Sequence, residues 1–468
     1  MVFSSLIFLF LFLPLVLVIY YLSPRMLRNG ILFAASLVFY AWGEPVYLFL
    51  MIFSTALDYT NGLLLDKHRG RKGIARAVFI GSIIANLGVL GFFKYYGFLV
   101  ATINDLFSLH IHAADLPLPV GISFYTFQTM SYVIDVYLGK VAVQKNFISF
   151  GAYVTMFPQL VAGPIVKYGD IAKQLAGRKV TIDQFGEGAE LFIKGLAKKV
   201  LLANNIGLLW TNVKAAPLDE LAVLSAWLGI VAFAFQIYFD FSGYSDMARG
   251  LGKMFGFDFL KNFNYPYVSK SITEFWRRWH ISLGSWFREY VYIPLGGNRE
   301  GTAKQLRNLF VVWMLTGLWH GANWNFILWG LYFGLFLALE KWFLLEWLKR
   351  RAHIVAHLYT LLIVIVGWVF FEFENLSSAW AFIGTMFGLG AHPLVDNQAL
   401  YDLSTHFALL IALAMCSTPL PEKAFSLLRE RWNITGAFIG TAVYSSLLFL
   451  STAYLVNETY NPFLYFRF

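Results

Sequence analysis

Two histidines stand in segments that are otherwise apolar or aromatic, and their side chains are the best candidates for chemistry in this sequence. His320 lies in LTGLWHGANWNFILWG (315–330), inside a long apolar stretch. His280 lies in ITEFWRRWHISLGSWFREYVYIPLGGNR (272–299), among several tryptophans and arginines. The ordinary pKa of an imidazole is close to working pH, so either side chain can accept a proton from a hydroxyl nucleophile.

His320 is expected near the middle of a membrane. Twelve residues separate it from Arg307, which ends a basic segment, and at helical rise they span roughly 18 Å of a hydrocarbon core about 30 Å thick. Polar side chains at such depth usually face an interior cavity, and a dry cavity would keep water away from a thioester. On this chemistry alone, a general base and an imidazole that only holds helices together by hydrogen bonds both remain open.

The surroundings of His280 admit a simpler interpretation. If residues 272–291 form one helix, Trp276, His280 and Gly284 share a face of it. Arginines and tryptophans mixed in this way are typical of an amphipathic helix at the inner membrane interface. That interpretation accounts for the charges but does not require a histidine at position 280.

The composition of the chain is that of a membrane protein. Of its 468 residues 58% are hydrophobic and 13% charged, and its mean hydropathy is +0.61, whereas soluble domains carry roughly 25% charged residues. Apolar stretches recur from Val2 to Leu455 without a polar linker. We therefore expect one polytopic membrane domain over residues 1–468, all α-helical, with about 11 to 14 membrane segments at roughly 20 residues per full span.

Basic residues predict the orientation of these segments. The net charge is +9, and Lys and Arg gather in loops such as 66–76, 249–308 and 423–431, which the positive-inside rule places in the cytoplasm. Both termini then lie on the export side, and no nucleic-acid partner is expected. The stretch 150–166 is interrupted by prolines and a glycine, which favours a re-entrant segment there.

Other polar residues are weaker candidates. Asp240 and Ser242 belong to a polar knot that is typical of a structural cluster or a tunnel wall. Tyr125 and Gln128 share one helical face, which lines a cavity or packs. No metal site is expected, because the single cysteine, Cys416, and the two central histidines come with no recognisable third ligand.

Motifs throughout the chain resemble the membrane-bound O-acyltransferase (MBOAT) family. The resemblance rests on the two histidine segments and on LPVGISFYTFQTMSYVIDVYLG (118–139), FPQLVAGPIVKY (157–168) and IYFDFSGYSDMARGLG (237–252). It covers essentially the whole chain and is closest to the branch that O-acetylates alginate. It implies a ring of helices with re-entrant segments around a central tunnel.

The resemblance also implies roles for individual residues. His320 matches the buried histidine of the family's WHG motif and would be the principal catalytic residue. His280 matches a position where members carry His or Asn, so its role is less fixed. The residues we expect to line the substrate tunnel are Trp276, Trp319, Asn323, Tyr125, Gln128, Asp240 and Ser242.

The activity that the resemblance implies is membrane O-acyl transfer. The enzyme would take an acetyl group from acetyl-CoA or another cytoplasmic acyl donor, without a tightly bound cofactor. It would pass the group across the bacterial inner membrane to an export-side acetyltransferase partner that acts on an alginate-like or cellulose-like exopolysaccharide. The alternative is a transporter or flippase of an acyl carrier or lipid without transferase chemistry, although the chain has no P-loop and no transmembrane array of acids.

The end of the chain carries one more candidate. Phe463 to Phe466 read FLYF and resemble the F-x-Y-F terminus of a small partner protein of teichoic acid D-alanylation, whose tyrosine is thought to carry the acyl group. Tyr465 would then accept the acyl group on its phenol, a good leaving group for a relay. The other interpretation is an aromatic anchor at the membrane interface.

Overall fold

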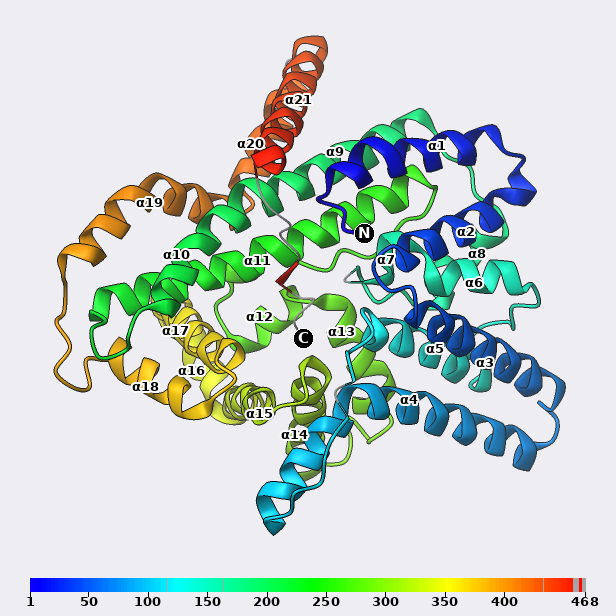
Figure 1. Cartoon of the computed structure of the whole chain (residues 1–468), viewed down its shortest axis with the longest axis horizontal. Helices are drawn as coiled ribbons and strands as arrows, with labels where there is room; N and C mark the ends of the chain where they lie inside the picture. The colour runs from blue at the N-terminus through cyan, green and yellow to red at the C-terminus, as the bar shows by residue number, and fades with distance from the viewer. Residues whose placement is uncertain (115, 162, 432, 458–462, 465–468) are drawn as a thin grey trace. The chain divides into compact units, whose positions relative to one another are not determined.

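The described backbone of the protein is helical and contains no β-strand (Figure 1). The expected all-α class is therefore confirmed. The computed structural model describes residues 1–114, 116–161, 163–431, 433–457 and 463–464.

The chain divides into two compact units, and the first consists of Met1–Phe192 and Tyr244–Leu260. Within the described residues, its first segment contains eleven consecutive helices, the last of which, α9, ends a few residues after Phe192. They are η1 (Phe8–Phe12), α1 (Leu13–Leu22), η2 (Arg25–Leu27), α2 (Arg28–Ala41), α3 (Tyr47–Lys67), α4 (Lys72–Phe107), α5 (Ile122–Tyr137), α6 (Phe147–Thr155), α7 (Phe157–Leu160), α8 (Tyr168–Ala176) and α9 (Ile182–Ala197).

The second unit consists of Ile193–Gly243 and Lys261–Phe468, and it contains both candidate histidines. Helix α11 begins in this unit and ends in the first. The helices are η3 (Lys198–Ala203), α10 (Asn204–Ala215), α11 (Val223–Met254), η4 (Pro266–Val268), α12 (Ile272–Arg278), α13 (Ile281–Phe287), η5 (Arg288–Tyr292), α14 (Thr302–His320), α15 (Trp324–Leu339), η6 (Glu340–Leu344), α16 (Leu345–Lys349), α17 (His353–Glu372), α18 (Leu376–Met386), α19 (Asn397–Cys416), α20 (Leu420–Arg431) and α21 (Asn433–Asn457).

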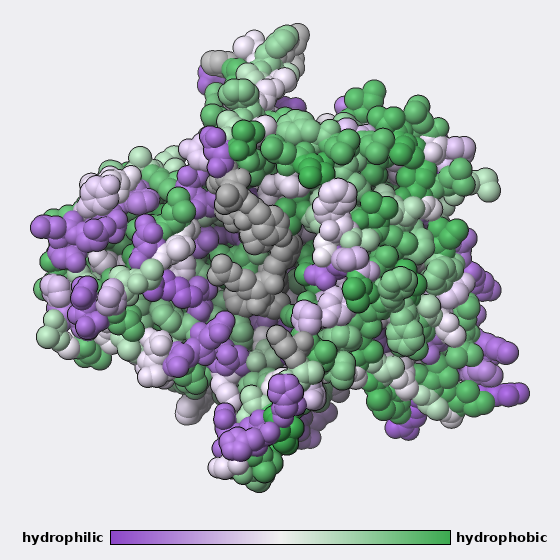
Figure 2. Space-filling view, in the orientation of Figure 1, coloured by the Kyte–Doolittle hydropathy of each residue, from purple (hydrophilic) through white to green (hydrophobic). Residues whose placement is uncertain are grey.

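Seven helical stretches in the described ranges are long and apolar enough to cross a membrane. The prediction of 11 to 14 segments also requires helices that are shorter or less apolar than these seven. One of the shorter helices is the apolar helix Phe8–Leu22. Apolar side chains of that helix face outward: Phe10 is 59% and Leu11 62% exposed, and hydrophobic residues cover this region of the surface (Figure 2). The seven stretches are 47–67, 72–107, 223–254, 324–349, 353–372, 397–416 and 435–457.

The interruption predicted within 150–166 is present. Helix α6 ends at Thr155, Met156 leaves the helical conformation, and the short helix α7 follows with Pro158 in its first turn. Proline is tolerated there because the first turn of a helix needs no donor from its N–H. A re-entrant path through the membrane remains a prediction.

Helices α14 and α15 lie side by side (Figure 1) and approach each other through glycines. A Cβ atom at Gly317 would stand 2.2 Å from the Phe326 carbonyl oxygen, and one at Gly330 would stand 2.2 Å from the Trp313 carbonyl oxygen. Small residues allow membrane helices to pack backbone against backbone. This packing fixes the end of α14, where His320 lies.

We predict that Gly317→Ala lowers the free energy of unfolding by about 1–3 kcal/mol, because the added methyl group forces α14 and α15 apart. The matched control is Gly81→Ala in α4, where a Cβ atom would meet no atom within 4 Å. Thermal unfolding of both variants in detergent measures the difference. Equal midpoints would contradict the close approach of the two helices.

Candidate active site

His280 stands at a break between two short helices, so the prediction of a single helix over 272–291 is wrong. Helix α12 ends at Arg278 and α13 begins after His280, whose φ of 46° and ψ of 54° place it in the left-handed region. This conformation is uncommon for a residue other than glycine, and it points to a local constraint. Trp276, His280 and Gly284 therefore do not follow one helical face.

Asn262 provides that constraint. Its Oδ1 atom accepts hydrogen bonds from the Ser282 N–H and the Ser282 hydroxyl, each at 3.0 Å, and its backbone carbonyl accepts one from the Ile281 N–H at 2.9 Å. Asn262 is 1% exposed. These bonds satisfy N–H groups at the start of α13 that have no partner within the helix, and they fix the backbone on the C-terminal side of His280.

Glu340 holds the other short helix from the opposite end. Its carboxylate accepts the Ile272 N–H at 2.6 Å, the Thr273 N–H at 2.8 Å and the Thr273 hydroxyl at 2.6 Å. Glu340 is 1% exposed. A negative charge at a helix N-terminus is stabilised by the unpaired N–H groups and by the helix dipole. This buried carboxylate thus holds the first turn of α12, together with the Ser271 hydroxyl that accepts the Glu274 N–H.

His320 is the last residue of α14. Gly321 caps the helix, and a Cβ atom there would lie 2.1 Å from the Phe326 ring. A side chain at this position would require the Phe326 ring to move. His320 is 5% exposed, so the turn leaves the imidazole inside the protein rather than in a loop.

Trp319 brings the two histidines into one site. Its ring centroid lies 5.8 Å from that of His280 and 5.0 Å from that of His320, edge-on in both cases. His320 also packs against Trp329 at 5.0 Å and Phe371 at 5.3 Å. We call these two histidines with Trp319, Trp329 and Phe371 the histidine cage, a buried and largely apolar environment.

The cage holds a neutral imidazole at His280, and two indole N–H groups in and next to it are available as donors. His280 lies outside the seven candidate spans, and burial lowers its pKa to about 3, so it is uncharged near neutral pH. The indole N–H groups of Trp276 and Trp329 are buried and have no hydrogen-bond partner among the described residues. Trp276 lies 5.4 Å from Trp329. Asn323 is the N-cap residue of α15 and makes no side-chain cap bond.

Asp240 and Lys199 form a second polar feature of the same unit. The two side chains make an ion pair and are 2% and 4% exposed. Asp240 also accepts the Leu464 N–H at 2.8 Å, and the Lys199 ammonium lies 4.9 Å from the centre of the Phe463 ring, which is 1% exposed. Phe463 and Leu464 therefore contact this ion pair, and we call Lys199 and Asp240 the tail dock.

The tail dock lies next to the histidine cage. Phe241 follows Asp240 in α11, and its ring centroid is 4.9 Å from that of His280. Ser242 is 2% exposed, and its hydroxyl has no hydrogen-bond partner in the described part of the chain. Tyr465, the predicted acyl carrier, lies outside the described residues.

Two predicted tunnel residues belong to the first unit. Tyr125 and Gln128 are buried on α5, and the Gln128 amide donates to the Tyr153 carbonyl at 2.8 Å. Of the predicted tunnel residues, Trp276, Trp319, Asn323, Asp240 and Ser242 belong with the histidines to the second unit.

The sequence did not single out several residues that position the site. Their polar types alone indicate that they need hydrogen-bond partners, because polar side chains inside apolar segments are rarely left without one. Those partners are distant in sequence. The positioning residues are Lys199, Asn262, Asn325 and Glu340.

The fold and site define a multi-pass helical membrane protein with a buried pair of histidines. The sequence model of the family described as "MBOAT, membrane-bound O-acyltransferase family" matches residues 142–373. A probable alginate O-acetylase AlgI of Azotobacter vinelandii is 40% identical over 501 aligned positions that cover 100% of both chains. The chain belongs to the membrane-bound O-acyltransferase family and is a membrane O-acyltransferase, which confirms the resemblance of its motifs.

More distant relatives are named for other polymers. A peptidoglycan O-acetyltransferase of Helicobacter pylori is 31% identical over 100% of this chain and 98% of its own length. A teichoic acid D-alanyltransferase of Bacillus subtilis is 27% identical over 65% of this chain and 78% of its own.

We predict that Glu340→Gln lowers the free energy of unfolding by about 2–3 kcal/mol, because an amide N–H₂ group would face the donors of α12 and one accepting oxygen would be lost. The matched control is Glu346→Gln, whose side chain is 68% exposed and pairs with Lys349; it should have little effect. Thermal unfolding in detergent compares them. A similar loss in both variants would show that Glu340 does not hold α12.

Proposed function

We propose that this enzyme transfers an acetyl group from a cytoplasmic donor, acetyl-CoA in the simplest case, toward an alginate-like exopolysaccharide on the export side of the bacterial inner membrane. The observation that carries the proposal is the histidine cage, in which one indole ring packs against both buried imidazoles. The full-length similarity to a probable alginate O-acetylase supports the acyl group and the polymer.

His320 acts as the general base in this proposal. Its imidazole takes the proton of an attacking hydroxyl while the hydroxyl oxygen bonds to the thioester carbonyl carbon. The carbon–sulfur bond then breaks, and the departing thiolate receives the proton from His320. The apolar rings of the cage keep water from competing for the acyl group, and the buried indole N–H groups of Trp276 and Trp329 are donors of the kind that stabilise a developing oxyanion.

The attacking hydroxyl is the phenol of Tyr465. Its neighbours Phe463 and Leu464 are held by Lys199 and Asp240, and Asp240 is followed by Phe241, which packs on His280. These contacts anchor the chain within two residues of Tyr465 beside the cage. The resulting phenyl ester is an activated acyl group that a polysaccharide-acetylating partner on the export side can use.

The orientation of the chain fits this direction of transfer. The distribution of Lys and Arg predicts both termini on the export side, and in this proposal the tail carries the acyl group to the side where the partner works. The donor enters from the cytoplasmic side, where the basic loops attract its phosphate groups.

We predict that His320→Ala lowers acetyl-CoA consumption by about 10²–10⁴-fold, the usual contribution of a general base. Purified enzyme in nanodiscs, with radiolabelled acetyl-CoA, measures CoA release. His320→Gln repeats the test with a side chain of similar size, and His110→Ala, in an exposed loop, is the control.

Thermal unfolding separates chemistry from folding in this test. Unchanged midpoints with lost turnover support the base. Full turnover in His320→Gln would refute it. If wild-type enzyme consumes no acetyl-CoA, either alone or with its partner, then acetyl-CoA is the wrong donor or the chain transports an acyl carrier or lipid without transferring the acyl group.

We predict that Tyr465→Phe abolishes labelling of the protein by acetyl-CoA while the fold is retained, because only the phenol oxygen is removed. The matched control is Tyr454→Phe on α21, whose side chain is 44% exposed. Hydroxylamine should release the label from wild-type protein, as expected for an ester. Labelling that persists in Tyr465→Phe would leave this residue as a membrane anchor and move the acyl acceptor elsewhere.

A further inference from the structure

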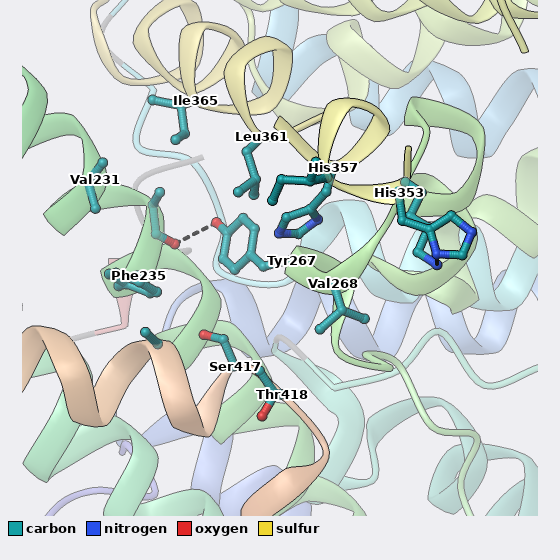
Figure 3. A pocket seen from close by; sticks show the side chains of 14 residues that line it. Val231, Phe235, Tyr267, Val268, His353, His357, Leu361, Ile365, Ser417 and Thr418 are labelled. Carbon is teal, nitrogen blue, oxygen red and sulfur yellow. Dashed lines mark hydrogen bonds between the residues drawn. The ribbon is translucent and has the colours of Figure 1, made fainter. Parts of the chain in front are cut away.

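The second unit contains a cavity of about 610 Å³ that neither histidine of the cage lines. Its walls come from α11, from the segment around η4, from α17 and from the end of α19 (Figure 3). Tyr267 forms part of the wall and is fixed there, since its hydroxyl donates to the Ala234 carbonyl at 2.6 Å and accepts from the Trp368 indole at 3.1 Å.

The cavity follows one face of α17 from its first residue. His353, His357, Leu361 and Ile365 line it at a spacing of four residues, so they share a face of the helix. From His353 to Ile365 the helix rises roughly 18 Å, about the depth of one leaflet. Figure 3 shows the imidazoles toward one side and Val231 toward the other, so the lining changes from polar to aliphatic along the cavity.

The polar end is positively charged. The Lys270 Nζ atom lies 3.1 Å from the His353 Nδ1 atom, and among the described residues Lys270 takes part in no ion pair. The nearby carboxylate of Glu274 accepts the Lys270 backbone N–H at 3.0 Å and pairs with Arg278 at 2.8 Å, so it does not pair with the Lys270 ammonium. Arg350 and Arg351 precede His353 in the sequence. An anion would therefore complete this end of the cavity.

A buried donor faces the cavity as well. Ser417 is 4% exposed, lines the cavity, and its hydroxyl has no hydrogen-bond partner within the described ranges. A buried hydroxyl without a partner is costly, and an ester or phosphate oxygen of a bound molecule would satisfy it.

We propose that this cavity binds one anionic phospholipid. Its phosphate lies against Lys270 and His353, and one acyl chain extends along Leu361 and Ile365. An α-helix of a second copy is about 10 Å wide and does not match a cavity of this volume, whereas an acyl chain is narrow and apolar throughout. The polar-to-apolar gradient over one leaflet is the complement of a lipid.

Native mass spectrometry of the full chain tests the proposal, with phosphatidylglycerol and phosphatidylcholine as probes. Wild-type enzyme should retain one phosphatidylglycerol in preference to phosphatidylcholine. The double variant Lys270→Gln/His353→Gln, at two exposed positions, should lose that preference by about fivefold, as expected for a basic side chain near an anionic headgroup. The control Lys304→Gln/His110→Gln makes the same chemical changes at other exposed positions and should behave as wild type.

A second variant tests the apolar part independently of charge. Ala414→Trp places a bulky ring in the cavity wall and should reduce retention of both lipids. Three results would overturn the proposal: equal retention of the two lipids by wild type, an equal loss in the control, or displacement of bound phosphatidylglycerol by coenzyme A. The last result would assign the cavity to the acyl donor.

Discussion

A single buried carboxylate supports the architecture around the candidate active site. Glu340 accepts two backbone N–H groups and a hydroxyl at the start of α12, which has only seven residues. A helix of that length is not stable by itself, and a charge is costly to bury unless it is hydrogen-bonded. The carboxylate stabilises the short helix, and the N–H groups of the helix provide the hydrogen bonds that the buried charge needs. Because α12 is fixed at its first turn, the chain can leave the helix six residues later and place His280 at the break.

The two histidines reach the same cage by different means. His320 ends a long helix, and its position follows from the glycine-mediated packing of α14 on α15. His280 occupies a left-handed position that Asn262 holds by capping the next helix. Burial among aromatic rings favours the uncharged form of imidazole, and only the uncharged form can accept a proton. For His280 the lowered pKa leaves the imidazole uncharged near neutral pH.

Sequence reasoning succeeded where the signal is local. Long apolar helices and the interruption around Pro158 follow from hydropathy and from the properties of proline and glycine. It failed at residues 279–280, because no breaker stands there and the aromatic and basic residues around them fit a helix. The break is imposed by Asn262 and Glu340, which lie 18 residues before and 60 residues after His280. Such partners become visible only in the folded chain.

The ion pair of Lys199 and Asp240 is hard to explain by stability alone. Desolvation of two charges can exceed their attraction, so a buried salt bridge is weak evidence that it stabilises a fold. In this protein the pair does something that apolar residues could not: Asp240 accepts the Leu464 N–H, and Lys199 faces the Phe463 ring. The next residue of α11, Phe241, contacts His280. Two adjacent residues of α11, Asp240 and Phe241, thus connect Leu464 to the histidine cage.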